Sequence, residues 1–256
     1  MKITMKNWTY TPATALLQTI SFPKSAFNSE YDILNRSIFF AWQLVLRVIL
    51  KLCYQLNIHG QENIPHHGSY ILISNHCSHF DTMCLLSVVP LSRITETYAA
   101  AAEDHFFVTR WKANIVNNLF HALPFSRFKT RETHQSLQQC KYLLSSRERT
   151  LIFFPEGQRS MNGVIQPFKR GIGFLLAGTH LKVIPVHIQG AHKAWPKANT
   201  LPGPGKLQVK IGKPLQFPNT PRTSRSYAHI STIIERELKT LTETPHHNGE
   251  YREKST

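Results

Sequence analysis

Short apolar runs that alternate with segments of helical spacing constrain the fold of this chain most strongly. The apolar runs are residues 70–74 (YILIS), 151–154 (LIFF), 183–188 (VIPVHI) and 207–211 (LQVKI). Helical spacing of apolar residues occurs in residues 131–146, 169–181 and 226–242. Strands that alternate with helices are typical of an α/β domain, so we predict a mostly parallel central sheet flanked by helices.

A strongly apolar segment, residues 37–54 (SIFFAWQLVLRVILKLCY), precedes the first predicted strand. Its polar residues Gln43, Arg47 and Lys51 are four apart, so on a helix they form one polar stripe while apolar side chains cover the rest. This pattern predicts an amphipathic, membrane-associated helix over residues 37–57 that lies in the bilayer interface. The residues expected to dock on the membrane are Phe39, Phe40, Trp42, Arg47 and Lys51.

Two alternatives for the 37–57 segment remain open. A spanning helix would place Arg47 near mid-bilayer, at a cost of about 2.5–3.5 kcal/mol, and a core helix would bury the apolar side chains inside the domain. Residues 1–36 are predicted to be an irregular or weakly helical lead-in without a signal-peptide pattern. The polar residues 243–256 are expected to be a disordered tail.

The charge of the chain predicts an anionic partner. Its 256 residues include 30 Lys and Arg against 15 Asp and Glu, which gives a formal net charge of +15 at pH 7. Nucleic acid, an anionic membrane and a phosphorylated substrate all fit that charge, and composition does not choose among them. The four cysteines form no CxxC pair, so a reduced compartment is the simplest interpretation.

The first candidate site is the segment Asn75–Asp81 (NHCSHFD), directly after a predicted strand, where open α/β sheets place their ligands. His76 and Asp81 can meet if His76 lies in the loop and Asp81 in the first helical turn; Ser78 and Asp81 fit a capping box that starts this helix. The carboxylate would then orient the imidazole as a base. Alternatively, Asp81 only caps the helix and His76 is an ordinary loop histidine. A metal site is a third option, but no second ligand cluster has zinc spacing.

The second candidate site is residues 154–160 (FPEGQRS), again after a predicted strand. Gly157 permits a sharp turn, Arg159 could clamp a phosphate, and Glu156 could accept a hydroxyl hydrogen or hold Arg159. The alternative is a polar turn with a local Glu–Arg pair. Arg127, in the segment PFSR, is a weaker third candidate. No GxSxG, P-loop, GxGxxG or HExxH motif is present, so hydrolase, nucleotide-binding and zincin functions lack their usual support.

Four blocks together resemble the glycerolipid acyltransferase family, whose best-known members are 1-acyl-sn-glycerol-3-phosphate acyltransferases. SNHCSHFDT is similar to the N-H-x-x-x-x-D block and FPEGQRS to F-P-E-G-T-R-S. ALPFSR is similar to the block with a substrate-binding arginine, and VIPVHIQG to the V-P-V block. The blocks occur in the family's order with compatible gaps over roughly residues 58–215, so we expect a catalytic domain over residues 58–242.

The resemblance implies transfer of a fatty acyl group from acyl-CoA or acyl-carrier protein to a hydroxyl of a lysophospholipid, first of all 1-acyl-sn-glycerol-3-phosphate. It implies that His76 is the general base and that Asp81 orients it. Pro185 would lie on the strand that lines the acyl path. The implied acceptor-binding residues are Asn75, Ser78, Arg127, Glu156, Gly157 and Arg159. No metal, bound cofactor or covalent acyl-enzyme is implied, and attachment is expected at the cytoplasmic face of a membrane.

Two departures from the family pattern bear on the acceptor. Gln158 stands where threonine is usual, and residues 101–107 (AAEDHFF) stand where many members carry a lysine. Glu103 and Asp104 make that segment acidic, so the acceptor could be another lysolipid or glycerol 3-phosphate.

A lipid-binding homologue that lost activity and a nucleic-acid-binding protein are the rival hypotheses. The second has only the +15 charge in its favour, because the basic residues are scattered and no binding motif appears, so we expect no nucleic-acid partner.

Overall fold

The computed structural model describes residues 29–106, 118–127 and 130–243. The described strands form a sheet of order β1-β7-β6-β2-β5-β3-β4, with β8 paired to β6. Strands β6, β2, β5, β3 and β4 run parallel, while β7 and β8 pair antiparallel with β6. The predicted α/β fold with a mostly parallel sheet is therefore confirmed.

The strands lie at β1 (Asn57–His59), β2 (Tyr70–Ser74), β3 (Thr97–Ala102), β4 (Ala122–Phe125), β5 (Thr150–Phe153), β6 (Thr179–Gln189), β7 (Gln208–Ile211) and β8 (Leu215–Phe217). The helices lie at α2 (Ser29–Cys53), α3 (Phe80–Val88), α4 (Glu103–Phe106), α6 (Thr130–Ser146), α7 (Gly171–Leu176), α8 (Ala191–Ala194) and α9 (Ser224–Glu243). Short 3₁₀ turns occupy η2 (Gln61–Asn63) and η3 (Leu91–Glu96). The predicted helix over 169–181 is wrong in its second half, because the chain enters β6 at Thr179.

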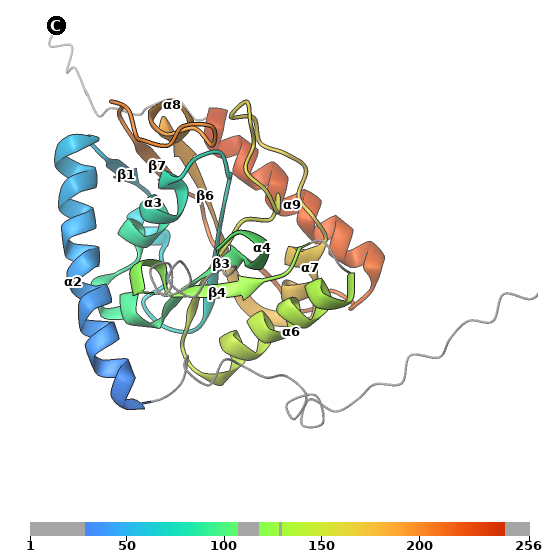
Figure 1. The fold of residues 1–256 in the computed structure, drawn as a ribbon. Coiled ribbons are helices and arrows are strands. Elements are labelled where there is room, and N and C mark those ends of the chain that lie inside the picture. Colours follow the sequence, from blue (N-terminus) through green and yellow to red (C-terminus); the bar gives the residue numbers. More distant parts are fainter. Residues whose placement is uncertain (1–28, 107–117, 128–129, 244–256) are drawn as a thin grey trace, which may run out of the picture.

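Helices cover both faces of the sheet (Figure 1). Alternate residues of β2 enter two different apolar clusters, as the two-residue period of a strand requires. Leu72 packs in a cluster with α2 and α3, whereas Ile71 and Ile73 pack in a cluster with α6, α7 and α9. All five residues of β2 are buried, which explains why its sequence is apolar without alternation.

The parallel register brings the loops after neighbouring strands together. Ile73 of β2 pairs with Phe153 of β5. His76 comes three residues after Ile73, and Glu156 comes three residues after Phe153. Ala102 of β3 pairs with Phe125 of β4. Asp104 comes two residues after Ala102, and Arg127 comes two residues after Phe125. The two candidate segments and the PFSR segment therefore meet at one edge of the sheet, at the carboxyl ends of the strands.

Helix α2 begins at Ser29, eight residues before the predicted start at residue 37, and ends at Cys53. Of the expected lead-in 1–36, residues 29–36 belong to α2 and residues 1–28 lie outside the described residues. Of the expected tail 243–256, Glu243 ends α9 and residues 244–256 lie outside the described residues. The polar stripe of the helix is real, but it faces the domain. Gln43 is fully buried, and Arg47 donates hydrogen bonds to the carbonyl oxygens of Leu86 (3.2 Å) and Val89 at the end of α3.

This orientation corrects the expected docking face of the helix. Phe39 is fully buried and stacks on His121 with ring centroids 3.7 Å apart, and Trp42 packs against the core cluster. Arg47 is held by carbonyl groups at the C-terminus of α3, and a positively charged guanidinium is favourable at a helix C-terminus. Phe40 and Lys51 remain exposed. The outward face is apolar instead, and its large side chains are Ile38, Phe40, Leu44, Val45, Val48, Ile49 and Leu52.

No helix in the described part of the chain combines the length and the apolar character that crossing a bilayer requires.

Candidate active site

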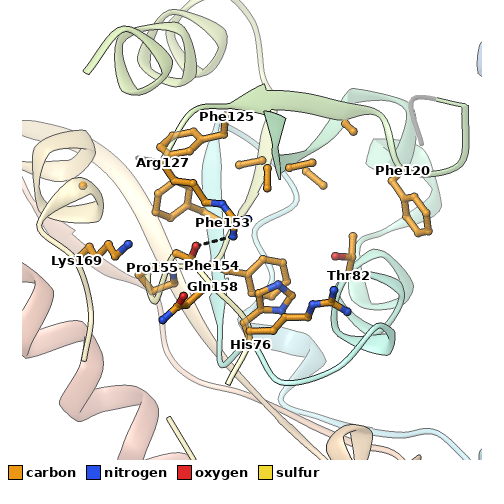
Figure 2. Close-up of a pocket in the computed structure, with 18 of the residues that line it drawn as sticks. His76, Thr82, Phe120, Phe125, Arg127, Phe153, Phe154, Pro155, Gln158 and Lys169 are labelled. Atoms are coloured by element: carbon orange, nitrogen blue, oxygen red, sulfur yellow. Dashed lines mark hydrogen bonds between the residues drawn. The ribbon is translucent and has the colours of Figure 1, made fainter. Parts of the chain in front are cut away.

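A cavity of about 660 Å³ opens at the carboxyl edge of the strands. Figure 2 shows His76, Arg127, Phe120 and Phe125 among the side chains that line this cavity. Its polar lining includes His76, Ser78, His79, Arg127, Gln158, Arg159, Lys169 and Lys197, and its apolar lining includes Met83, Ala99–Ala102, Phe120, Phe125, Phe153 and Phe154. The site therefore combines an apolar compartment with several cationic groups.

His76 and Asp81 meet as the sequence predicts. The Nδ1 atom of His76 lies 2.8 Å from Oδ2 of Asp81, whose side chain is fully buried. The imidazole also stacks on Phe154, with centroids 3.9 Å apart and an interplanar angle of 15°. With Nδ1 donating to the carboxylate, Nε2 carries the free lone pair, and this is the ring nitrogen left for a substrate.

Asp81 also binds the backbone of the loop that leads into helix α3. Its Oδ2 atom accepts hydrogen bonds from the backbone N–H groups of Cys77 (2.7 Å) and Ser78 (2.8 Å), and the Ser78 hydroxyl accepts from Phe80 N–H (3.0 Å). One carboxylate oxygen therefore contacts both the imidazole and the backbone of the loop. The imidazole is thus held from its side chain and from its backbone, while its orientation as a base stays a prediction.

Glu156 is a buried carboxylate that holds the histidine loop and does not line the cavity. Its Oε1 accepts from His76 N–H at 2.8 Å and its Oε2 accepts from Gln166 N–H at 3.1 Å. Burial raises the pKa of Glu156 to about 7, against the opposing effect of these two hydrogen bonds. Ser160 N–H donates in turn to His76 O at 2.7 Å, so the two loops are joined in both directions.

Arg159 lies beside the histidine loop. Its Nη1 atom is 2.7 Å from Nε2 of His79, and burial followed by the charge of Arg159 lowers the pKa of that histidine. His79 is therefore a neutral acceptor at pH 7, which leaves the guanidinium as the charged group. Lys169 faces the same cavity, close to Gly157, where a Cβ atom would lie 2.8 Å from its Nζ. Gly157 has φ 74°, as expected of a sharp turn.

Arg127 reaches this turn from the other side. Its Nη1 donates to Gly157 O at 3.0 Å (Figure 2). Its Nε and Nη2 atoms donate to Oδ1 and Oδ2 of Asp104 at 3.1 and 3.0 Å. The acidic departure in residues 101–107 is thus bound to the arginine of the PFSR segment.

Besides Glu156, two predicted acceptor-binding or path-lining residues, Asn75 and Pro185, lie away from the cavity lining. Asn75 pairs with the backbone of Ile188, donating to its carbonyl at 3.0 Å and accepting from its N–H at 2.9 Å, which ties the histidine loop to β6. Pro185 is buried in β6 opposite Ile73 of β2. Ser78 lines the cavity, but its hydroxyl donates to Trp195 O at 2.7 Å. Their roles in substrate binding stay predictions.

One cysteine, Cys77, lies next to His76 in this loop. Burial, and then the charges of Asp81 and Glu156, raise the pKa of the Cys77 thiol, so it stays protonated at neutral pH. No three His, Cys, Asp or Glu side chains in the described ranges are grouped to hold a metal ion.

Sequence reasoning did not single out Trp195, considered His79 only as a possible metal ligand, and named Asp104 only as part of an acidic segment. Trp195 packs against His79 and Phe80 and closes one side of the cavity. The signal for Asp104 was the acidic segment itself, but its meeting with Arg127 depends on the β3–β4 register. No local signal marks Trp195, which arrives from the far end of β6.

Comparison with known proteins places the chain in a family. The family model "Acyltransferase" matches residues 55–189. A 1-acyl-sn-glycerol-3-phosphate acyltransferase of Limnanthes douglasii is 28% identical over 62% of this chain and 54% of its own length. The alpha form of that enzyme from Mus musculus is 24% identical over 77% of this chain and 70% of its own length. This chain thus spans about half the length of the plant relative that it matches.

The fold is also that of a solved structure. The crystal structure of the 1-acyl-sn-glycerophosphate acyltransferase PlsC from Thermotoga maritima superposes with a TM-score of 0.59 and 20% identity. The match covers 91% of this chain and 89% of that one. At this identity the likeness concerns the fold, whereas the family model covers more than half of the sequence. The chain described above, with its histidine loop inside the matched residues, belongs to the acyltransferase family.

Proposed function

We propose that this protein transfers a fatty acyl group from a thioester to the free hydroxyl of a lysophospholipid, with 1-acyl-sn-glycerol 3-phosphate as the first acceptor and phosphatidic acid as the product. The donor would be acyl-CoA or acyl-carrier protein. The observation that carries the proposal is the 2.8 Å contact of His76 Nδ1 with the buried carboxylate of Asp81 at the mouth of the cavity. The names of the related enzymes support the same acceptor.

The geometry supports a direct transfer. His76 Nε2 takes the proton of the acceptor hydroxyl while its oxygen bonds to the thioester carbonyl carbon. The tetrahedral intermediate then breaks its C–S bond, and the imidazolium returns the proton to the leaving thiolate. A thioester is already activated, so the base has only to improve a weak oxygen nucleophile, which is worth about 10²–10⁴-fold. Asp81 stabilises the transient imidazolium through Nδ1.

The cationic lining would hold the acceptor's phosphate. Arg159 and Lys169 line the cavity from the loop after β5, and Arg127 lines it from the loop after β4. Arginine matches the oxygens of a phosphate in a bidentate manner, and Lys169 adds a point charge. Glu156 supports this arrangement indirectly, because it fixes the backbone of His76 and the turn that carries Arg159.

Radiolabelled acyl transfer to a panel of acceptors tests the proposal. The panel should contain 1-acyl-sn-glycerol 3-phosphate, glycerol 3-phosphate, lysophosphatidylcholine and monoacylglycerol, each with acyl-CoA and with acyl-carrier protein. Transfer to the first acceptor, with deacylated thiol released in equal amount, is the expected result. Binding of lysolipids without transfer to any of them would identify a lipid-binding protein and contradict the proposed reaction.

Membrane association is the second part of the proposal. The outward face of α2 exposes Val45, Val48 and Leu52 at 52%, 55% and 74%, which is unusual for large apolar side chains in water. Lys51 is exposed beside them, and the chain carries a formal charge of +15. An anionic bilayer surface suits an apolar helix face flanked by positive charge.

Vesicle flotation tests this docking face. The double variant Val48→Asp with Leu52→Asp should lose most of its binding to vesicles that contain anionic phospholipid. Thr232→Asp, on the exposed side of α9, is the matched control, because it adds a charge to the other large helix. Equal flotation of the double variant and the control would contradict docking through α2.

A further inference from the structure

We infer that Asp104 is an internal competitor for Arg127, so that it weakens the binding of phosphomonoester acceptors and acts as a specificity-determining residue. The inference rests on the proposed function, because it assumes that Arg127 belongs to the acceptor site. It explains why an acidic segment stands at the edge of a cavity that is otherwise lined by cations.

The contact between the two side chains has the geometry that a phosphate would use. Asp104 Oδ1 and Oδ2 accept from Nε and Nη2 of Arg127 at 3.1 and 3.0 Å, so the carboxylate occupies one whole edge of the guanidinium. Nη1 donates at the same time to Gly157 O. Two oxygens of a phosphate bind arginine through the same paired N–H groups. A phosphate can therefore take this edge only when Asp104 leaves it.

The backbone places Asp104 in this position by register. Ala102 of β3 pairs with Phe125 of β4. Asp104 lies two residues beyond the first, and Arg127 lies two residues beyond the second. Asp104 lies in α4, a helix of only four residues, and its side chain is 42% exposed, compared with 24% for Arg127. Withdrawal of the carboxylate into solvent thus leaves Arg127 in place, supported by Gly157.

The charge balance gives the direction of the effect. While the pair is formed, Arg127 contributes little net positive charge, and Arg159 and Lys169 must attract the acceptor. A carboxylate about 4 Å from a phosphate also repels it by about 1 kcal/mol in water and more where water is excluded. Both effects are strongest for a doubly charged phosphomonoester and absent for an acceptor that has no phosphate. Asp104 thus weakens the preference of the site for phosphomonoester acceptors over acceptors that have no phosphate.

Calorimetric titration with a short-chain 1-acyl-glycerol 3-phosphate tests the inference directly. Asp104→Asn keeps the shape of the side chain and removes its charge. We expect its Kd to be roughly three- to tenfold lower than that of the wild type, the range of a partly exposed ion pair. A monoacylglycerol of the same chain length should bind equally to both proteins. Glu103→Gln is the matched control, since it removes an exposed negative charge one residue away and should leave both Kd values unchanged.

A variant of Arg127 separates competition from simple repulsion. In an Arg127→Gln background, Asp104→Asn should lose most of its gain, because the group for which it competes is absent. A gain of the same size in that background would overturn the inference, and so would an unchanged or higher Kd for Asp104→Asn alone. Failure of acyl transfer by the wild type would contradict the proposed function instead, while the Kd comparison would still decide the role of Asp104.

Discussion

The loops after β2 and β5 begin side by side, yet they hold their functional groups in different ways. In residues 75–81, one carboxylate oxygen of Asp81 binds His76, Cys77 and Ser78, so the imidazole is held by a residue of its own loop. In residues 154–160, the contacts reach outward, from Glu156 to His76 and from Gly157 to Arg127. In the proposed reaction the first loop would carry the reacting nitrogen, and the second would position it and supply charge. Variants in the first should change kcat, and variants in the second should change KM or stability.

Asp81→Asn should have the largest effect among the positioning residues. The amide cannot stabilise an imidazolium. If its oxygen takes the place of Oδ2, its NH2 group stands in the buried place of Oδ1, which has no hydrogen-bond partner among the described residues. We expect kcat to fall by about 10²–10⁴ with little change in KM, and the free energy of unfolding to fall by about 1–3 kcal/mol. Steady-state kinetics and urea denaturation measure the two effects. A rise in KM with kcat intact would contradict the division between the two loops.

Arg159→Gln should affect binding more than turnover. The substitution removes a half-buried positive charge from the cavity and leaves the contact between His76 and Asp81 in place. We expect KM for 1-acyl-sn-glycerol 3-phosphate to rise about tenfold or more, since hydrogen bonds to charged groups contribute about 1.5–3 kcal/mol. Lys213→Gln, an exposed lysine that does not line the cavity, is the control. A loss confined to kcat would place Arg159 with the reacting group instead.

Glu156→Gln should reveal the buried carboxylate through the pH dependence of stability. The pKa of Glu156 is raised from 4.5 to about 7 in the folded protein, so folding favours its protonated form. Its contribution is fully present below about pH 4.5 and is lost as the pH rises through about 7. Between pH 5 and pH 8, the wild type should therefore lose on the order of 1–3 kcal/mol relative to Glu156→Gln. Urea denaturation at both pH values measures this difference, and a constant difference would contradict the buried position.

The fold was predictable where a local pattern determines the structure. Strands β2, β5, β6 and β7 are apolar runs, and the S-x-x-D pattern gave the start of α3 within two residues. Strand β3 (TYAAAA) was missed because alanine favours helices, and β4 (ALPF) because it is short and contains proline. Strands β1 and β8 have three residues each, too few for a periodicity.

The site, like the fold, was predictable only where a local sequence pattern determines the contact. The meeting of His76 and Asp81 follows from five residues of sequence, whereas the contacts of Glu156 and Asp104 depend on which strands are neighbours. The stripe of α2 was visible, but its direction was not. The carbonyl groups at the end of α3, which are remote in sequence, draw Arg47 inward and leave the apolar side chains outside.

Turnover of His76→Ala tests the central claim most directly. The variant removes the imidazole and keeps the backbone contacts of the loop, since Asp81 still accepts from the backbone of Cys77 and Ser78 and Glu156 still accepts from the backbone of residue 76. We predict that kcat for transfer to 1-acyl-sn-glycerol 3-phosphate falls by about 10²–10⁴ or more, while the Kd of that lysolipid and the thermal unfolding temperature stay at wild-type values. Turnover close to that of the wild type would show that His76 is not the base.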